Sequence, residues 1–248
     1  MPTVRRTIQK AVNTILIPAG YELLPRFKRD YVRSYQPLRE TLKEARKAGL
    51  SIGDYLDKKY QLPGVTQSTI DQLASYGILN SEIKRVCEIG PGTGRYLERI
   101  QRLCSPSSYE VYETDPQWDD YVVRMFHVTS RETDGLSLRQ TDNDSVDLVH
   151  AHRVFPYLPF IVQCRYFLEM IRITKPGGWI VFDTFTEPCM TEELLQKWIG
   201  DQRTDPCMVP RKFMEDLFAR RQCSLRWSFF IHFRPGITEY LVFTKNRI

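Results

Sequence analysis

Short apolar runs alternate with longer stretches of helical periodicity from Lys84 onward. Strands are expected at 85–89, 109–112, 146–151 and 179–182, and helices at 95–103, 118–126 and 160–173. Pro176-Gly177-Gly178 predicts a turn before the last of these strands. Because strands alternate with helices, the pattern predicts an α/β fold whose parallel sheet carries helices on both faces.

The two ends of the chain have different patterns. Apolar runs at 225–233 and 239–244 flank Arg234-Pro235-Gly236-Ile237, which predicts a terminal antiparallel hairpin. Helices are expected at 31–48, at 51–59 and from Thr66 or Ser68 to Gly77. We therefore expect two domains, an N-terminal helical cap at 1–80 that contributes to substrate binding and a second domain at 81–248.

Charge and cysteine content narrow the location of the protein. Of the net charge of +5, residues 1–60 contribute 13 Lys/Arg against 6 Asp/Glu, so the second domain is nearly neutral. The basic amphipathic segment 4–17 allows two interpretations, peripheral contact with the inner membrane surface or packing on the next domain. Six cysteines without a CxxC pair are typical of buried thiols in a reducing, cytoplasmic compartment, and no zinc site is expected.

Three glycines lie between a predicted strand and a predicted helix, where a cofactor can approach the backbone closely. Gly90, Gly92 and Gly94 have the spacing G-x-G-x-G, and Glu88 precedes them. Dinucleotide enzymes usually have G-x-G-x-x-G instead. Glu113, at the end of the next strand, can accept hydrogen bonds from ribose hydroxyls, a feature that NAD enzymes share.

The order of motifs over residues 84–246 resembles the class I S-adenosylmethionine-dependent methyltransferases. The resemblance is carried by Glu88–Gly94, Tyr112–Pro116, Asp134-Gly135, Asp147–His152 and Lys175–Trp179. It implies a Rossmann-like seven-stranded sheet, mostly parallel, with an antiparallel terminal strand. It also implies that S-adenosylmethionine is bound by Glu88, Gly90, Gly92, Gly94, Glu113, Thr114, Asp134, Gly135 and Ala151.

Candidate catalytic residues follow the fourth and fifth strands, where open α/β sheets bind ligands. His152 is the first candidate for a general base, since an unperturbed imidazole titrates near neutral pH. Its neighbour His150 is interpreted as structural. Asp183 and Glu187 are second candidates, which could orient a polar acceptor or bind a divalent cation with His152. No metal site is predicted, because no carboxylate pair has clear ligand spacing.

The acceptor is narrowed by what the sequence lacks. The run after the fourth strand, 152–157, is not the Asn/Asp-Pro-Pro-aromatic run of enzymes that methylate base amino groups. The nearly neutral second domain also argues against a nucleic-acid substrate. Residues 17–25 and 86–159 are similar to sugar O-methyltransferases of bacterial surface-polysaccharide clusters.

This similarity implies O-methylation of a sugar hydroxyl on a glycan or glycolipid precursor. We expect Tyr55, Tyr157 and Arg153 to contact the acceptor. Two alternatives stay open at this point. One is methylation of a small natural product such as a polyketide or phenol, suggested by Trp227, Phe229 and Phe230. The other is a cofactor-binding scaffold without catalysis. The sequence does not predict the oligomeric state.

Overall fold

The computed structural model describes residues 12, 14, 37–201, 206–234 and 236–247. Residues 36–248 form one compact unit, which contains all the elements described below. Apart from Val12 and Thr14, the amphipathic segment 4–17 lies outside the described residues, as do residues 17–25 and the start of the helix expected at 31–48.

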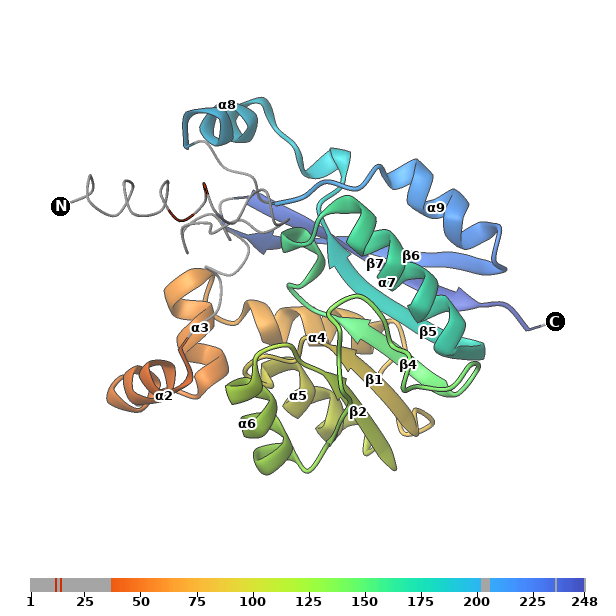
Figure 1. Cartoon of the computed structure of the whole chain (residues 1–248), viewed down its shortest axis with the longest axis horizontal. Helices are drawn as coiled ribbons and strands as arrows, with labels where there is room; N and C mark the ends of the chain where they lie inside the picture. The colour runs from red at the N-terminus through yellow and green to blue at the C-terminus, as the bar shows by residue number, and fades with distance from the viewer. Residues whose placement is uncertain (1–11, 13, 15–36, 202–205, 235, 248) are drawn as a thin grey trace. The chain divides into compact units, whose positions relative to one another are not determined.

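Seven strands form one sheet in the order β3-β2-β1-β4-β5-β7-β6 (Figure 1). Strands β1 to β5 pair in parallel, and β7 is antiparallel to both β5 and β6. The seven-stranded, mostly parallel sheet predicted from the sequence is therefore confirmed. The strands are β1 (Arg85–Ile89), β2 (Ser108–Tyr112), β3 (Thr129–Ser130), β4 (Val146–Ala151), β5 (Thr174–Thr184), β6 (Cys223–Phe233) and β7 (Gly236–Lys245).

The strand order changes direction at β1, which pairs with β2 on one side and β4 on the other. The connections that leave the carboxyl ends of β1 and β4 therefore diverge. Ligands of open α/β sheets bind at such a point. The topology thus favours a ligand site beside the residues that follow Ile89 and Ala151.

Eight α-helices and two short 3-10 helices surround the sheet in the described part of the chain. Ser51 caps one of them, since its hydroxyl accepts a hydrogen bond from the Asp54 amide at 3.1 Å. The helices are α2 (Leu38–Lys47), α3 (Ile52–Tyr60), α4 (Val65–Ser75), α5 (Arg95–Cys104), α6 (Pro116–Phe126), α7 (Phe160–Ile173), α8 (Glu192–Asp201) and α9 (Arg211–Ala219), with η4 (Phe155–Tyr157) and η5 (Glu187–Cys189).

Alternate side chains of each strand enter two different cores. One core joins Val86, Leu148 and Val181 of the sheet to α4 and α5. The other joins Val149 and Phe182 to α7 and α9. Figure 1 shows these two pairs of helices on opposite sides of the sheet.

Helix α4 lies in the segment expected to belong to the cap, but it packs within the sheet's own core. Ile70 and Leu73 of α4, together with Ile78, are buried in the same cluster as Val86. The hydrophobic core is therefore continuous across the domain boundary expected at residue 80. That residues 1–80 contribute to substrate binding stays a prediction.

Besides η4 and η5, three elements were not expected from the sequence: β3, α8 and α9. The apolar residues of α9 recur at helical spacing, and Met214 and Phe218 are buried on one side of the helix. The turn expected at 176–178 also differs, because these residues lie inside β5. Pairing of β5 with β4 passes from Thr174 directly to Trp179, so the intervening residues form an irregularity in the strand.

None of the described helices is both long enough and apolar enough to cross a membrane.

Candidate active site

The turn after β1 contains three glycines with positive φ angles of 64°, 50° and 76° at Gly90, Gly92 and Gly94. A Cβ at Gly90 would lie 2.8 Å from Val154, and a Cβ at Gly94 would collide with Phe126. A Cβ at Gly92 would have nothing within 4 Å. Two of the glycines therefore allow close packing of the protein on itself, and the space beside Gly92 is open.

Glu113 follows β2 and lies beside this turn. Its Oε2 accepts a hydrogen bond from the Gly92 amide at 2.8 Å, and its Oε1 accepts one from the Asp115 amide at 2.9 Å. The side chain is buried, with 8% of the residue exposed. Two backbone donors therefore fix the carboxylate before a ligand binds.

Thr114 and Gly135, which follow Glu113 and Asp134 in the chain, lie in contact with each other. A Cβ at Gly135 would lie 3.7 Å from the Thr114 methyl group. The exposed Asp134 accepts hydrogen bonds from the amides of Leu136 and Ser137 at 2.9 and 2.8 Å. Partial burial raises the pKa of Asp134, but these hydrogen bonds outweigh that effect and lower it. Asp134 is thus a carboxylate whose orientation is set by its own turn.

Glu88 is buried in the sheet and belongs to a chain of hydrogen bonds. The Tyr109 hydroxyl donates to Glu88 Oε2 at 2.7 Å and lies 3.0 Å from His150 Nε2. Since the tyrosine proton is directed to Glu88, His150 must carry a proton on Nε2 to complete the chain. Burial raises the pKa of Glu88 to about 8 and lowers that of His150 to about 3. His150 is therefore neutral and buried, in agreement with its structural interpretation.

His152 lies directly after β4. It is also close to the glycine turn, since Val154, two residues further along the chain, packs on Gly90. The imidazole stacks on Tyr96 of α5, with ring centroids 4.0 Å apart. Its Nδ1 is 3.0 Å from the Tyr240 hydroxyl, and its Nε2 has no hydrogen-bond partner in the described part of the chain. Burial lowers the pKa of His152 well below 6.5, and the nearby charge of Arg153 lowers it further.

Asp183, near the end of β5, is hydrogen-bonded to the segment after β4, and no hydrogen bond joins it to His152 in the described part of the chain. Its Oδ1 accepts a hydrogen bond from the Arg153 amide at 2.6 Å, and its Oδ2 accepts one from Thr238 at 2.9 Å. Burial raises the pKa of Asp183, and the Arg153 charge opposes this rise. The observed contacts of Asp183 are therefore those of a residue that positions Arg153.

Glu187 and Tyr55 form hydrogen bonds with residues other than His152 and Arg153. Glu187 accepts a hydrogen bond at 2.7 Å from the amide of Arg211, the first residue of α9. Tyr55 on α3 pairs with Lys59, whose Nζ donates to the tyrosine hydroxyl at 2.8 Å. Among the described residues, no group of three His, Cys, Asp or Glu side chains could hold a metal ion. The structure therefore does not assemble His152, Asp183 and Glu187 around one point.

Tyr157, in contrast, lies beside the segment that carries Arg153. Its ring packs against Phe233, with centroids 5.5 Å apart, and the Arg153 guanidinium lies over the same ring at 5.4 Å. Ala151 is fully buried at the end of β4 and pairs with Ile89.

Sequence reasoning missed Tyr96 and Tyr240, which border His152 on α5 and β7. Tyr96 follows the glycine turn by two residues, so its position next to the site could have been inferred. Tyr240 lies 88 residues from His152 and is brought there by the antiparallel strand. Burial raises the pKa of Tyr96, but the Arg153 and Arg95 charges outweigh burial and lower it.

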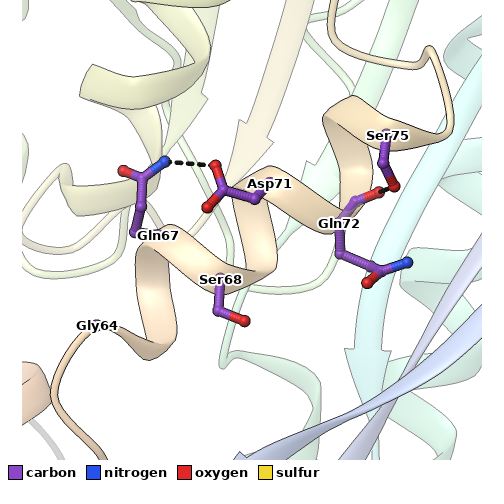
Figure 2. Close-up of a pocket in the computed structure, with 6 residues that line it drawn as sticks. All are labelled: Gly64, Gln67, Ser68, Asp71, Gln72 and Ser75. Carbon is purple, nitrogen blue, oxygen red and sulfur yellow. Dashed lines mark hydrogen bonds between the residues drawn. The ribbon is translucent and has the colours of Figure 1, made fainter.

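A separate surface hollow runs along α4 (Figure 2), lined by Gly64, Gln67, Ser68, Asp71, Gln72 and Ser75. Its polar side chains bond locally, as Gln67 does to Asp71 at 2.8 Å. The hollow contains none of the residues predicted to bind a cofactor or acceptor.

Comparison with known proteins identifies the fold and the family. A family model described as a methyltransferase domain matches residues 58–226. No curated protein sequence matches the chain. Many solved structures do match, and three of them illustrate the range.

The N-methyltransferase NodS from Bradyrhizobium japonicum is 16% identical, with a TM-score of 0.55 over 77% of this chain and 100% of that one. Magnesium protoporphyrin IX methyltransferase from Synechocystis PCC 6803, solved with S-adenosylmethionine, is 10% identical, with a TM-score of 0.53 over 73% and 78%. Geranyl diphosphate C-methyltransferase from Streptomyces coelicolor, solved with S-adenosylhomocysteine, is 12% identical, with a TM-score of 0.56 over 72% and 79%. At these low identities the similarity shows a shared fold, and it does not indicate which acceptor this chain methylates.

Proposed function

Since this chain belongs to the methyltransferase domain family and is an S-adenosylmethionine-dependent methyltransferase, we propose that it methylates a sugar hydroxyl of a glycan or glycolipid precursor. One observation carries the proposal: Val154 packs on Gly90, so the glycine turn adjoins His152 and Arg153. A cofactor at the turn and an acceptor at the end of β4 would therefore be neighbours.

The residues at the turn fit S-adenosylmethionine. Gly92 leaves space for its methionine part, and Glu88 would pair with the ammonium group. The fixed carboxylate of Glu113 would accept hydrogen bonds from the ribose hydroxyls, with Thr114, Asp134 and Gly135 beside the adenine. The cofactor supplies an electrophilic methyl group on sulfonium sulfur.

We assign His152 the role of accepting the proton that the acceptor hydroxyl would lose when the methyl group leaves sulfur for oxygen. Its low pKa keeps the imidazole neutral at neutral pH, as a base requires. Proton transfer to Nε2 requires the tautomer in which Nδ1 carries the proton and donates to Tyr240. Stacking on Tyr96 then holds the ring in one plane.

Aromatic side chains near the end of β4 suit a sugar, whose apolar face stacks on rings. Tyr157 is the described candidate, since it is partly exposed and packs on the buried Phe233. The aromatic residues that suggested a small phenolic acceptor are largely occupied. Trp227 stacks on Tyr76 at 4.9 Å, and Phe229 stacks on Tyr240 at 5.0 Å. Only Phe230 of that group is exposed.

The test is transfer of labelled methyl groups from S-adenosylmethionine to sugar-containing envelope precursors and to a panel of phenols. We expect label in the glycan fraction, and label confined to phenols would overturn the sugar assignment. His152→Ala should keep S-adenosylhomocysteine affinity within about twofold and lower kcat about 10²–10⁴-fold. His127→Asn, at an exposed helix end with positive φ that asparagine tolerates, is the matched control. Normal turnover by His152→Ala would remove His152 from the mechanism.

A further inference from the structure

Arg153 is buried with unused hydrogen-bond donors. Its side chain is 7% exposed, and neither Nη1 nor Nη2 has a hydrogen-bond partner in the described part of the chain. Its Nε faces the protein, 3.5 Å from the Tyr96 hydroxyl and 4.0 Å from Asp183 Oδ2. One side of the guanidinium is thus engaged and the other is left for a ligand.

The charge on Arg153 is permanent. Burial lowers its pKa, but Tyr96 and Asp183 outweigh burial and raise the pKa above the ordinary value. A buried guanidinium with unmet donors is unfavourable unless something accepts from them. Asp183 compensates the charge but bonds the backbone amide, so it does not satisfy the Nη pair.

The backbone at Arg153 is also unusual. Its φ of +61° is in the left-handed region, which disfavours a residue with a side chain. The hydrogen bond to Asp183 holds this conformation and turns the side chain toward Phe233. Residues held in such rare backbone conformations cluster at active sites and ligand sites.

The surroundings favour an anion. Because β6 runs in the same direction as β5, its last residues lie at the sheet edge where β4 ends. His232 there has an Nδ1 without a described partner. Burial lowers the His232 pKa, and the charges of Arg153 and Arg234 lower it further. Two cations, Arg153 and Arg234, therefore lie near His232.

We propose that the acceptor carries an oxyanion, a carboxylate or a phosphate, which accepts two hydrogen bonds from Nη1 and Nη2 of Arg153. A planar guanidinium matches both groups in this way. The inference rests on the proposed position of the acceptor at the end of β4. It narrows the acceptor from a sugar to a sugar acid or sugar phosphate.

The test compares acceptors in pairs that differ only in an anionic group, with the full-length protein and S-adenosylmethionine. The sugar pairs are a methyl glucoside with the matching glucuronide and with the 6-phosphate. A third pair, catechol and dihydroxybenzoate, contains no sugar. The expected result is a kcat/KM at least tenfold higher for an anionic member. The pair that shows this increase tells whether the acceptor carries a carboxylate or a phosphate.

Arg153→Gln should reduce this preference at least tenfold while S-adenosylhomocysteine affinity stays within about twofold. Arg153→Lys keeps the positive charge but lacks the two parallel N–H donors of a guanidinium. It should therefore retain part of the preference. Arg165→Gln, an exposed arginine on α7, controls for net charge. Calorimetric binding of each pair to the wild-type protein with S-adenosylhomocysteine gives a result even if a variant does not fold.

Equal kcat/KM and equal binding within every pair would overturn the proposal, as would a preference unchanged in Arg153→Gln. A preference seen only in the catechol pair would overturn the sugar assignment and keep the anion site.

Discussion

At the scale of single residues, Glu88 should make cofactor binding depend on pH. Because its pKa is about 8 in the free protein, the carboxyl is mostly protonated at neutral pH. Pairing with an ammonium group favours the carboxylate, so binding should release a proton. The Kd for S-adenosylhomocysteine should therefore fall as pH rises toward 8, by up to about tenfold per pH unit.

Calorimetry in two buffers of different ionisation enthalpy measures this proton directly. Glu88→Gln should abolish the release, and Glu98→Gln, exposed on α5, should keep it. A raised folded pKa also means that Glu88 lowers the free energy of unfolding as pH rises from the ordinary carboxyl range to about 8. A Kd that does not change between about pH 5.5 and 7.5 would contradict the assignment.

The three glycines of the turn should respond differently to alanine. Gly94→Ala should lower the free energy of unfolding by about 1–3 kcal/mol, since strain at φ +76° adds to the collision with Phe126. Gly92→Ala should cost only about 1–2 kcal/mol of stability but weaken S-adenosylhomocysteine binding at least tenfold. Gly77→Ala, with φ +72° and open space around it, controls for strain alone. Equal cofactor binding by the Gly92 and Gly77 variants would show that Gly92 does not face the ligand.

The residues predicted to bind the cofactor depend on local spacing more than those predicted to contact the acceptor. Glu88, Gly92 and Glu113 lie in short segments at strand ends, where local spacing decides position. The contacts of His152 depend on long-range packing with Tyr96 and Tyr240. Local spacing does not contain that information, so Asp183 and Glu187 were grouped with His152 although their observed contacts lie elsewhere.

At the scale of elements, Asp57 joins three helices near the turn. Fully buried on α3, it accepts hydrogen bonds from the Thr66 amide and hydroxyl at 2.9 and 2.8 Å and pairs with Arg95 at 2.9 Å. Asp57→Ala should therefore lower the free energy of unfolding by about 3–5 kcal/mol, because Arg95 would stay buried without a partner. Urea unfolding measures the loss.

The exposed Asp54 on the same helix provides the comparison. It pairs with Arg99 at 3.6 Å, and Asp54→Ala should cost about 1 kcal/mol or less. Adding Arg95→Met to Asp57→Ala should recover part of the stability. Similar losses in the two aspartate variants would contradict the assigned role of the buried pair.

Elements with strong periodicity were predicted, and short or irregular ones were not. Helix α7 and strand β4 were identified to the residue. Strand β3 has only two residues, too few for a period, and exists through its pairing with β2. The glycines at 177 and 178 predict a turn, but pairing on both sides of them extends β5 through that point.

At the scale of the whole molecule, the unit at 36–248 should fold without the first 35 residues. It contains both faces of the sheet and their covering helices. A chain lacking residues 1–35 should unfold cooperatively and bind S-adenosylhomocysteine within about twofold of the full chain.

The deleted segment carries 7 Lys/Arg against 2 Asp/Glu, so the deletion should weaken sedimentation with phosphatidylglycerol vesicles. Phosphatidylcholine vesicles are the control for charge. Unchanged binding to anionic vesicles would assign any membrane contact to another part of the protein.

The fixed carboxylate of Glu113 has a consequence for flux in the cell. Two backbone amides orient it in advance, and the proposed contacts of Glu113, Asp134 and Gly92 are with parts that the methyl donor and its spent form share. A preorganised site of this kind holds the product about as well as the donor. Turnover would then follow the ratio of donor to product, so the protein would work only as fast as other enzymes remove S-adenosylhomocysteine.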